Sequence, residues 1–407
     1  MVNNLEYADQ SANGLVLDYI PIKVRGMDFS YGGIDKVSVS PVMTLLGANA
    51  CGKSNILKAL IVLKKLVESG FDFGLYTPFV FDEFGKKLQD RDPTEFKLLF
   101  DTNGFVYEYF VSFNKYGFCS EALYVHDGTD SNPIKVFDTD DSDLFSKEIF
   151  PDIEVNEQEI IYCSKIKNIS LLYLLEDAGK LGTSFYEHVK NAFEFIKSGI
   201  VGSDDVGTID LPPDVNEARL YISKIKYILW QMGFDNVDII LDESLTAESN
   251  IDKVFMVYKL QDGSLCFMNL KEHESTGTQN LFRFIKIIID VVSKGGVIIY
   301  DEIDRTIHTE LLRYLFSIFI NKEVNSNSQL ICSSHNPCVL YHLGPACIGL
   351  VEKKNFITKI RYLSGYELKP NEDLLKSYLR GDFGAKPRSI NYLNADDFKM
   401  VGGKDVR

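Results

Sequence analysis

The fold of this chain is decided by the stretch Gly47-Ala48-Asn49-Ala50-Cys51-Gly52-Lys53-Ser54-Asn55, which follows the apolar run 42–46. After it, apolar residues recur at helical spacing. A short apolar strand, a loop bounded by glycines and then a helix are the context in which Gly-x4-Gly-Lys-Ser is a P-loop. Successive backbone N–H groups of such a loop, at the positive end of the helix dipole, cradle phosphate groups. Residues 47–55 are therefore predicted to bind a nucleoside triphosphate.

Two side chains of this P-loop have distinct predicted roles. Lys53 would reach the β- and γ-phosphates, and the hydroxyl of Ser54 would complete the shell of a Mg²⁺ ion. The alternative is a glycine-rich turn that matches the pattern by accident, and motifs farther along the chain weigh against it.

The composition is that of a globular protein. At 407 residues the chain is long enough for two or three compact units, and its 45% hydrophobic content supports real cores. No stretch approaches the roughly 20 apolar residues that cross a bilayer, and residues 1–15 lack the character of a secretory signal. The seven scattered cysteines predict reduced thiols, and the net charge of −15 argues against generic coating of nucleic acid. We therefore expect a cytoplasmic protein with no membrane association.

The pattern along the chain predicts an α/β nucleotide-binding head with a small antiparallel β subdomain and a helical insertion. Asn103-Gly104 separates two strand-like runs and is a hairpin signal, whereas the apolar spacing from 160 to 230 is helical. Residues 127–143 are loop-like, and we interpret their aspartates as a solvated surface rather than a metal site. The predicted divisions are a first lobe with the P-loop at 1–75, the β subdomain at 76–126, the mainly helical insertion at 127–253, a second lobe at 254–365 and a C-terminal tail at 366–407.

The second lobe contains an acidic pair, Asp301 and Glu302, directly after the apolar run 297–300. Ligands of open α/β sheets bind at the carboxyl ends of the strands, where this pair would lie. Asp301 is predicted to hold Mg²⁺ through water, and Glu302 to orient the attacking water or accept its proton. The alternative is that the two acids cap the next helix, which the P-loop makes the weaker interpretation.

Two further motifs in this lobe suggest phosphate contacts. His335 ends the strand-like run 329–333, where it could contact a γ-phosphate, although a histidine here could also be structural. Ser275, Thr276 and Gly277 open an apolar-periodic helix and offer a hydroxyl and free N–H groups to an anion. An ordinary helix cap would look the same.

In their order, these elements resemble the Walker A, signature, Walker B and switch-histidine motifs of ABC-type ATPases. The details are most similar to the bacterial ATPases related to the OLD nucleases and to the RloA, AbiL and PARIS phage-defence proteins. The matching stretches are 47–55, 274–279, Asp-Glu-Ile-Asp-Arg-Thr-Ile-His at 301–308, Ser-Ser-His-Asn at 333–336, 93–96 and 378–387. Glu274 and His308 stand where transporter-type proteins carry leucine and aspartate, and both agree with the defence-type branch.

The resemblance implies an ABC-type head that binds ATP and Mg²⁺ between two copies of the chain, in a homodimer or a higher homo-oligomer. Ser275, Thr276 and Gly277 of one copy would close over the γ-phosphate held by Lys53 of the other. Asp304 and His308 would form the D-loop, and His335 would be the switch histidine, catalytic together with Glu302 and Lys53. The Q-loop glutamine has no clear counterpart, Gln89 being only a candidate.

Relatives that cut nucleic acid carry a TOPRIM domain after the ATPase, and the residues after His335 are too few for one. The leading hypothesis is therefore a sensor or regulator in an antiphage abortive-infection system. It would control a separately encoded toxin or nuclease and respond to a phage protein or nucleic acid. The alternative is a DNA-repair or DNA-end-binding ATPase of the RecF or SMC kind, which the acidic balance and the absence of long heptads disfavour. A transporter subunit is disfavoured by Glu274 and by the insertion.

Overall fold

The computed structural model describes most of the second lobe and of the β subdomain, and the part of the first lobe that carries the P-loop. The described residues are 40–69, 93–114, 116–126, 133–146, 161, 169–178, 183–203, 211–212, 214–234, 237–241, 254–325, 327–354, 357–370 and 372–386. The first part of the predicted first lobe and the Q-loop candidate Gln89 lie outside this range.

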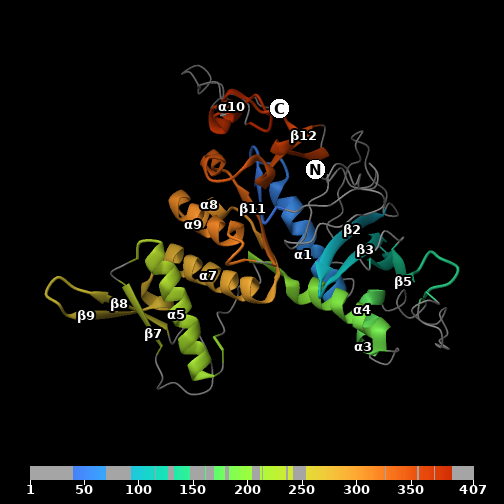
Figure 1. Ribbon diagram of the computed structural model, residues 1–407, viewed down its shortest axis with the longest axis horizontal. Coiled ribbons are helices and arrows are strands. Elements are labelled where there is room, and N and C mark those ends of the chain that lie inside the picture. The colour runs from blue at the N-terminus through green and yellow to red at the C-terminus, as the bar shows by residue number, and fades with distance from the viewer. Residues whose placement is uncertain are drawn as a thin grey trace, which may run out of the picture.

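A six-stranded sheet forms the centre of the fold and carries the P-loop strand in its middle (Figure 1). Five strands are parallel and the edge strand β13 is antiparallel to its neighbour. In spatial order they are β13 (Ile357–Tyr362), β12 (Ile348–Lys354), β1 (Val42–Leu46), β11 (Ser328–Ser334), β10 (Gly296–Tyr300) and β6 (Ile200–Gly202). Every residue of β1, β10 and β11 is buried, as expected for parallel strands covered on both faces. The predicted α/β class is confirmed.

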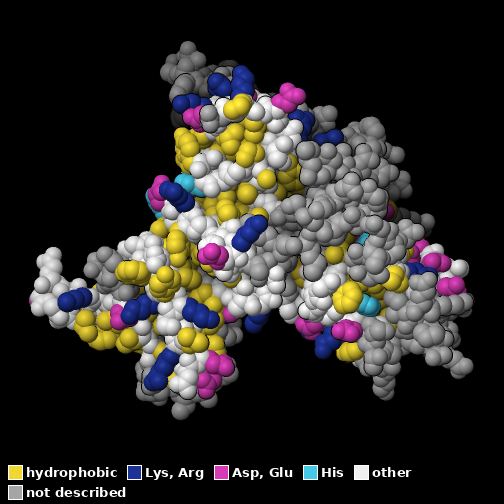
Figure 2. Space-filling model, viewed as in Figure 1, with side chains coloured by type: hydrophobic (Ala, Val, Ile, Leu, Met, Phe, Trp, Pro, Cys, Tyr) yellow, Lys and Arg dark blue, Asp and Glu magenta, His cyan; other side chains and the backbone are white. Residues whose placement is uncertain are grey.

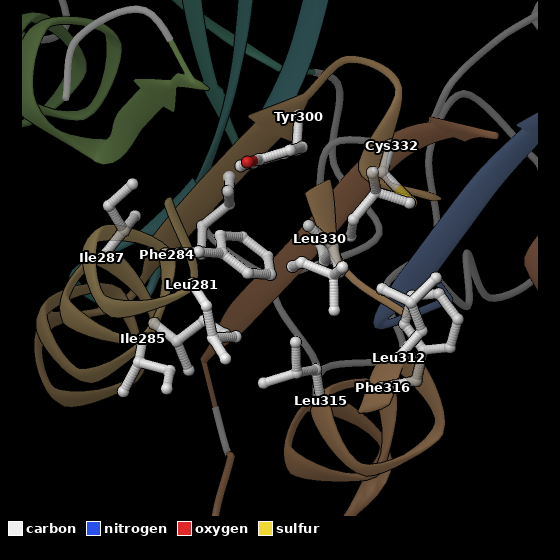
Figure 3. Packing of buried hydrophobic residues seen from close by; sticks show 14 of the residues in the cluster. Leu281, Phe284, Ile285, Ile287, Tyr300, Leu312, Leu315, Phe316, Leu330 and Cys332 are labelled. Carbon is white, nitrogen blue, oxygen red and sulfur yellow. The ribbon is translucent and has the colours of Figure 1, made fainter. Parts of the chain in front are cut away.

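The two faces of this sheet carry separate apolar cores, because successive side chains of a strand point to opposite faces. Met43 and Leu45 belong to the core that includes α1 (Lys53–Ser69). Val42 and Leu46 belong to the core that includes α7 (Thr276–Lys294) and α9 (Thr309–Ile320). Figure 3 shows this second core, in which apolar residues of both helices meet Leu330 and Cys332. The P-loop strand is thus held between one helix on one face and two on the other (Figure 1).

The predicted hairpin at Asn103-Gly104 is present, and both residues have the positive φ that such a turn requires, 51° and 83°. It joins the first two strands of a four-stranded antiparallel sheet: β2 (Thr94–Thr102), β3 (Phe105–Asn114), β4 (Gly117–His126) and β5 (Ile134–Asp138). The prediction of a loop over 127–143 is wrong at β5. Val136 and Phe137 are fully buried there, although acidic residues follow them closely.

The range predicted to be a mainly helical insertion contains helices α3 (Leu171–Ala178), α4 (Thr183–Glu194) and α5 (Val215–Gln231), and a π-helical turn at Phe195–Gly199. It also contains three strands, which the prediction did not include. Each of them pairs with a strand that lies outside the insertion. β5 extends the four-stranded sheet, β6 joins the central sheet, and β7 (Val237–Leu241) forms a three-stranded sheet with β8 (Val254–Lys259) and β9 (Leu265–Asn269). The insertion is therefore not a separate helical unit.

The three-stranded sheet and the four-stranded sheet lie on opposite sides of the central sheet (Figure 1). The unit made by α5 and β7 to β9 exposes several large apolar side chains, among them Tyr227, Trp230, Leu265 and Phe267. Figure 2 shows hydrophobic side chains gathered over this part of the molecule. None of the described helices is long and apolar enough to cross a membrane.

The predicted C-terminal tail is partly a packed element. Helix α10 (Leu374–Arg380) and the residues after it bury Tyr378, Phe383 and Ala385 against the second core. The division at 366–407 stays a prediction, and its described part contains a helix and buried aromatic residues. The remaining short helices are α6 (Leu270–His273), α8 (Ile303–Thr306) and the 3-10 turns Pro337–Tyr341, Pro345–Cys347 and Leu363–Gly365.

Candidate nucleotide-binding site

The predicted P-loop, acidic pair and histidine lie at one edge of the central sheet. The strand register pairs Leu46 with Ser334 and Tyr300 with Cys332, so residues 47, 301 and 335 follow at the same carboxyl edge. This is the edge at which ligands of open α/β sheets bind. The structure therefore brings together three motifs whose farthest members, Gly47 and His335, are 288 residues apart in sequence.

The side chain of Lys53 is a buried cation without a buried anion beside it. The residue is 4% exposed, and its Nζ donates to the carbonyls of Gly47 at 2.8 Å and Ala48 at 3.2 Å. No carboxylate forms an ion pair with it within the described residues. A buried charge is costly unless it is paired, so the P-loop suits an anionic ligand. Helix α1 begins at Lys53, which adds the positive end of its dipole.

The thiol of Cys51 lies within the same loop. Burial raises its pKa, and the positive charge of Lys53 offsets this only in part. The thiol is therefore neutral at pH 7. It does not neutralise the positive charge of Lys53, which stays available to an anionic ligand.

The acidic pair is held by a serine that the sequence analysis did not single out. Ser333 is fully buried, and its Oγ donates to Oδ1 of Asp301 at 2.5 Å. The same Oγ accepts the backbone N–H of Glu302 at 2.8 Å. Glu302 has the left-handed conformation, with φ of 51° and ψ of 53°, which is uncommon outside glycine and asparagine. The serine thus fixes both the carboxylate of Asp301 and the backbone turn that aims Glu302. In the sequence, this serine could be singled out by its position at the end of the strand-like run 329–333.

The carboxylate of Glu302 faces His335 and Arg305. Its Oε1 lies 3.7 Å from Nε2 of His335, and its Oε2 lies 3.2 Å from Nη1 of Arg305. The carboxylate of Asp304 accepts the backbone N–H of His335 at 3.0 Å, so the predicted D-loop residue holds the predicted switch histidine. Both Glu302 and His335 keep more than a third of their side-chain surface exposed, which leaves them accessible to a ligand or to water. Arg305 belongs to the motif at 301–308, and the sequence predicted no role for it.

The signature segment lies away from the P-loop contacts of its own chain. Ser275 is the N-cap of α7, and its Oγ accepts the N–H of Thr278 at 3.1 Å. No hydrogen bond within the described residues joins Ser275, Thr276 or Gly277 to the P-loop, and all three are exposed. The sequence left open that this segment is an ordinary helix cap rather than a phosphate contact. The structure contains such a cap at Ser275. His308 likewise caps α9, with Nδ1 accepting the N–H of Glu310 at 3.3 Å.

The direction of α7 places the signature segment toward the edge that carries the P-loop. Phe284, in the first half of the helix, packs on Tyr300 at the carboxyl end of β10, with ring centroids 4.6 Å apart. Near the other end, the carbonyl of Val291 accepts a hydrogen bond from Ser328, the first residue of β11, at 2.7 Å. The helix therefore runs antiparallel to the strands, and its exposed N-terminus faces outward on the side where the strands end.

The donors available for Mg²⁺ are the hydroxyl of Ser54 and the carboxylate of Asp301. Ser54 is the second residue of α1, and Asp301 directly follows β10. Hydroxyl and carboxylate oxygens are the hard ligands that Mg²⁺ takes, and its shell is commonly completed by phosphates and water. Among the described residues, no three His, Cys, Asp or Glu side chains are grouped so that they could hold a metal by themselves.

The link from Ser333 to the acidic pair has a measurable consequence. Ser333→Ala removes the donor to Asp301 and leaves the N–H of Glu302 without its acceptor. We expect kcat for ATP hydrolysis to fall about ten- to hundredfold, as when the partners of metal ligands are removed. Steady-state phosphate release and the thermal midpoint measure this. Ser334→Ala is the matched control, because the hydroxyl of Ser334 bonds to Asn336 and, within the described part of the chain, not to the acidic pair. Equal rates for Ser333→Ala and the wild type would contradict the assigned role.

Solved structures to which this chain is similar include heads of SMC proteins. The SMC head domain from Thermotoga maritima is 16% identical with a TM-score of 0.41, the match covering 86% of this chain and 100% of that one. An SmcHead bound to the C-winged helix domain of ScpA is 15% identical with a TM-score of 0.42, covering 86% and 95%. An Smc head domain derived from Pyrococcus furiosus, with an extended coiled coil and bound to the C-terminal domain of ScpA, is 13% identical with a TM-score of 0.40, covering 87% and 96%. No curated protein matches this sequence.

One protein family matches most of the chain. Residues 42–340 match the family described as "AAA domain, putative AbiEii toxin, Type IV TA system". The matched range begins at the P-loop strand and includes the acidic pair, the signature segment and His335. The chain therefore belongs to this family of AAA-domain P-loop proteins.

Proposed function

We propose that this chain hydrolyses ATP at a site completed by a second copy of itself, and that it uses this cycle to regulate a separate effector. The observation that carries the proposal is the buried cation of Lys53 at the same sheet edge as Glu302 and His335. A phosphate-binding cation and a carboxylate placed to activate water are the parts that ATP hydrolysis needs.

Each residue has a role in this reaction. The P-loop amides and Lys53 bind the phosphates, and Glu302 orients the attacking water and accepts its proton. His335, 3.7 Å from Glu302, is placed to hydrogen-bond a γ-phosphate oxygen. Mg²⁺, held by Ser54 and Asp301, supplies charge neutralisation on the phosphates when it is bound.

The second copy supplies the signature segment. Ser275, Thr276 and Gly277 are exposed at the N-terminus of a 19-residue helix and have no bond to the P-loop of their own chain within the described residues. A helix N-terminus attracts phosphate, so the same segment of a partner copy can close the site in a symmetric pair. ATP then stabilises the pair, and hydrolysis allows it to separate.

The regulated process is an antiphage response. The description of the matched family names an AbiEii toxin and a type IV toxin–antitoxin system, and the motif resemblance is to phage-defence ATPases. The chain acts as sensor or regulator, and a toxin or nuclease encoded beside it is the effector. Salt-dependent DNA binding that appears only with ATP would instead support the DNA-end-binding function.

A plaque assay tests the regulatory role. Cells carrying this gene with its neighbouring gene are expected to resist a sensitive phage, and Lys53→Ala is expected to abolish the resistance because ATP no longer binds. Deleting the neighbouring gene is expected to abolish it as well. Efficiency of plating measures both, with Lys58→Ala, an exposed lysine of α1, as the control. If protection depends on Lys53 but persists without the neighbour, the paired system is wrong.

A further inference from the structure

The outer side of the P-loop is in contact with the C-terminal strands of the central sheet and with the segment that follows α10. Thr358, on β13, donates from Oγ1 to the carbonyl of Cys51 at 3.0 Å. The carbonyl of Ala385 accepts the N–H of Ala48 at 3.1 Å. Each hydrogen bond joins the loop to a residue more than 300 positions away. Thr358 lies in none of the matching stretches, and Ala385 lies in the stretch 378–387, for which the sequence predicted no role.

The bond from Thr358 fixes the peptide group between Cys51 and Gly52. No cis peptide bond is present among the described residues, and in a planar trans peptide the C=O and N–H point in opposite directions. With the carbonyl of Cys51 turned toward Thr358, the N–H of Gly52 points to the other side. Thr358 is 3% exposed and packs against the loop so closely that a Cβ on Gly52 would lie 2.3 Å from its Oγ1. The hydroxyl is therefore buried against the loop and bonded to it.

The hydrogen bond that the carbonyl of Ala385 accepts fixes the peptide group between Gly47 and Ala48 in the same way. With the N–H of Ala48 turned outward to Ala385, the carbonyl of Gly47 points inward, where it accepts Nζ of Lys53 at 2.8 Å. Ala385 is itself held, because its N–H donates to Oε1 of Glu352 at 2.7 Å and its carbonyl accepts the hydroxyl of Tyr378 at 3.3 Å. Two outer contacts thus set the inward-facing groups at both ends of the loop.

We propose that Thr358 and Ala385 orient the two peptide groups of the P-loop that meet the nucleotide, and that Thr358 is a positioning residue for nucleotide binding. The proposal rests on the nucleotide site proposed above. Thr358 holds the N–H of Gly52 toward the phosphates, and Ala385 holds the carbonyl of Gly47 toward Lys53. The C-terminal segment is in this sense part of the phosphate site, although it touches the loop only from outside.

Replacing the hydroxyl alone tests this role. Thr358→Val keeps the volume and removes the donor, whereas Thr358→Ser keeps the donor. We expect Thr358→Val to raise the Kd for N-methylanthraniloyl-ADP, measured by fluorescence anisotropy, about five- to tenfold, the loss of one hydrogen bond. The KM for ATP should rise with it, while kcat changes by less than about twofold, because the lost contact acts on ground state and transition state alike. Thr358→Ser should bind like the wild type.

Two further variants keep the test decisive. Thr44→Val removes a buried threonine hydroxyl of β1 that bonds to Cys332 and not to the loop, so it should lower stability without changing the Kd. Glu352→Ala frees Ala385 and should weaken nucleotide binding, whereas Glu352→Gln keeps an oxygen acceptor and should not. The proposal is overturned if Thr358→Val binds as tightly as the wild type, if Thr358→Ser behaves like Thr358→Val, or if Thr44→Val raises the Kd equally. A wild type that binds no nucleotide would overturn the proposed function as well.

Discussion

Replacing Glu302 by glutamine is expected to leave ATP bound but uncleaved and to hold two copies of the chain together. The amide keeps the size of the side chain but cannot accept the proton of the attacking water, so hydrolysis should fall by about two to four orders of magnitude. The left-handed backbone at Glu302 and its bond to Ser333 remain, so the turn that orients the side chain is intact. Multi-angle light scattering with ATP and Mg²⁺ should then show a doubled mass that the wild type reaches only transiently.

Two control variants test whether the doubled mass comes from uncleaved ATP held between two copies or from a general effect of substitution. Glu323→Gln changes an exposed carboxylate outside the site and should leave hydrolysis and mass unchanged. Adding Ser275→Arg to Glu302→Gln places a bulky cation at the exposed start of α7 and should restore the monomer in the presence of ATP. A mass that never depends on ATP, with the wild type a monomer throughout, would exclude the site completed in trans.

The motifs of the proposed nucleotide site could be located from the sequence because they are local. A strand, a glycine-bounded loop and a helix identify residues 47–54, and two acids after a buried run identify Asp301 and Glu302. Parallel strand ends meet at one edge, so the meeting of these motifs follows from the fold class alone. The short strand β5 was missed because Lys135 interrupts its apolar residues and acidic residues follow it closely.

The supporting contacts could not be predicted in this way. Ser333 bonds to residues 31 and 32 positions away, and Thr358 bonds to Cys51 across 307 positions. Nothing in the local pattern of β13 distinguishes Thr358 from any other strand threonine. The packing of Ala385 against the P-loop depends on where α10 lies, which is set by tertiary contacts such as the bond from Tyr366 to the carbonyl of Phe383. Contacts of this kind appear only once the chain is folded.

Replacing Lys53 by alanine is expected to remove nucleotide binding while leaving the fold intact. The ammonium contributes charged hydrogen bonds to phosphates, each worth about 1.5–3 kcal/mol, so affinity for ATP should fall about a hundredfold or more. In the absence of ligand the same ammonium is buried against neutral carbonyls, and its removal leaves no buried anion unpaired within the described residues. Thermal unfolding without nucleotide should therefore change little, and the stabilisation that ATP gives the wild type should disappear.

The same variant can show which copy supplies which half of the site. Lys53→Ala and Ser275→Arg are each expected to be inactive alone, since every site of either homodimer lacks one half. Mixed in equal amounts, they form heterodimers in which one of the two sites combines an intact Lys53 with an intact Ser275. Such a mixture should regain hydrolysis that neither variant shows alone, because only a mixed pair contains one complete site. No recovery on mixing, with exchange of subunits verified by a tagged copy, would place both halves of the site in a single chain.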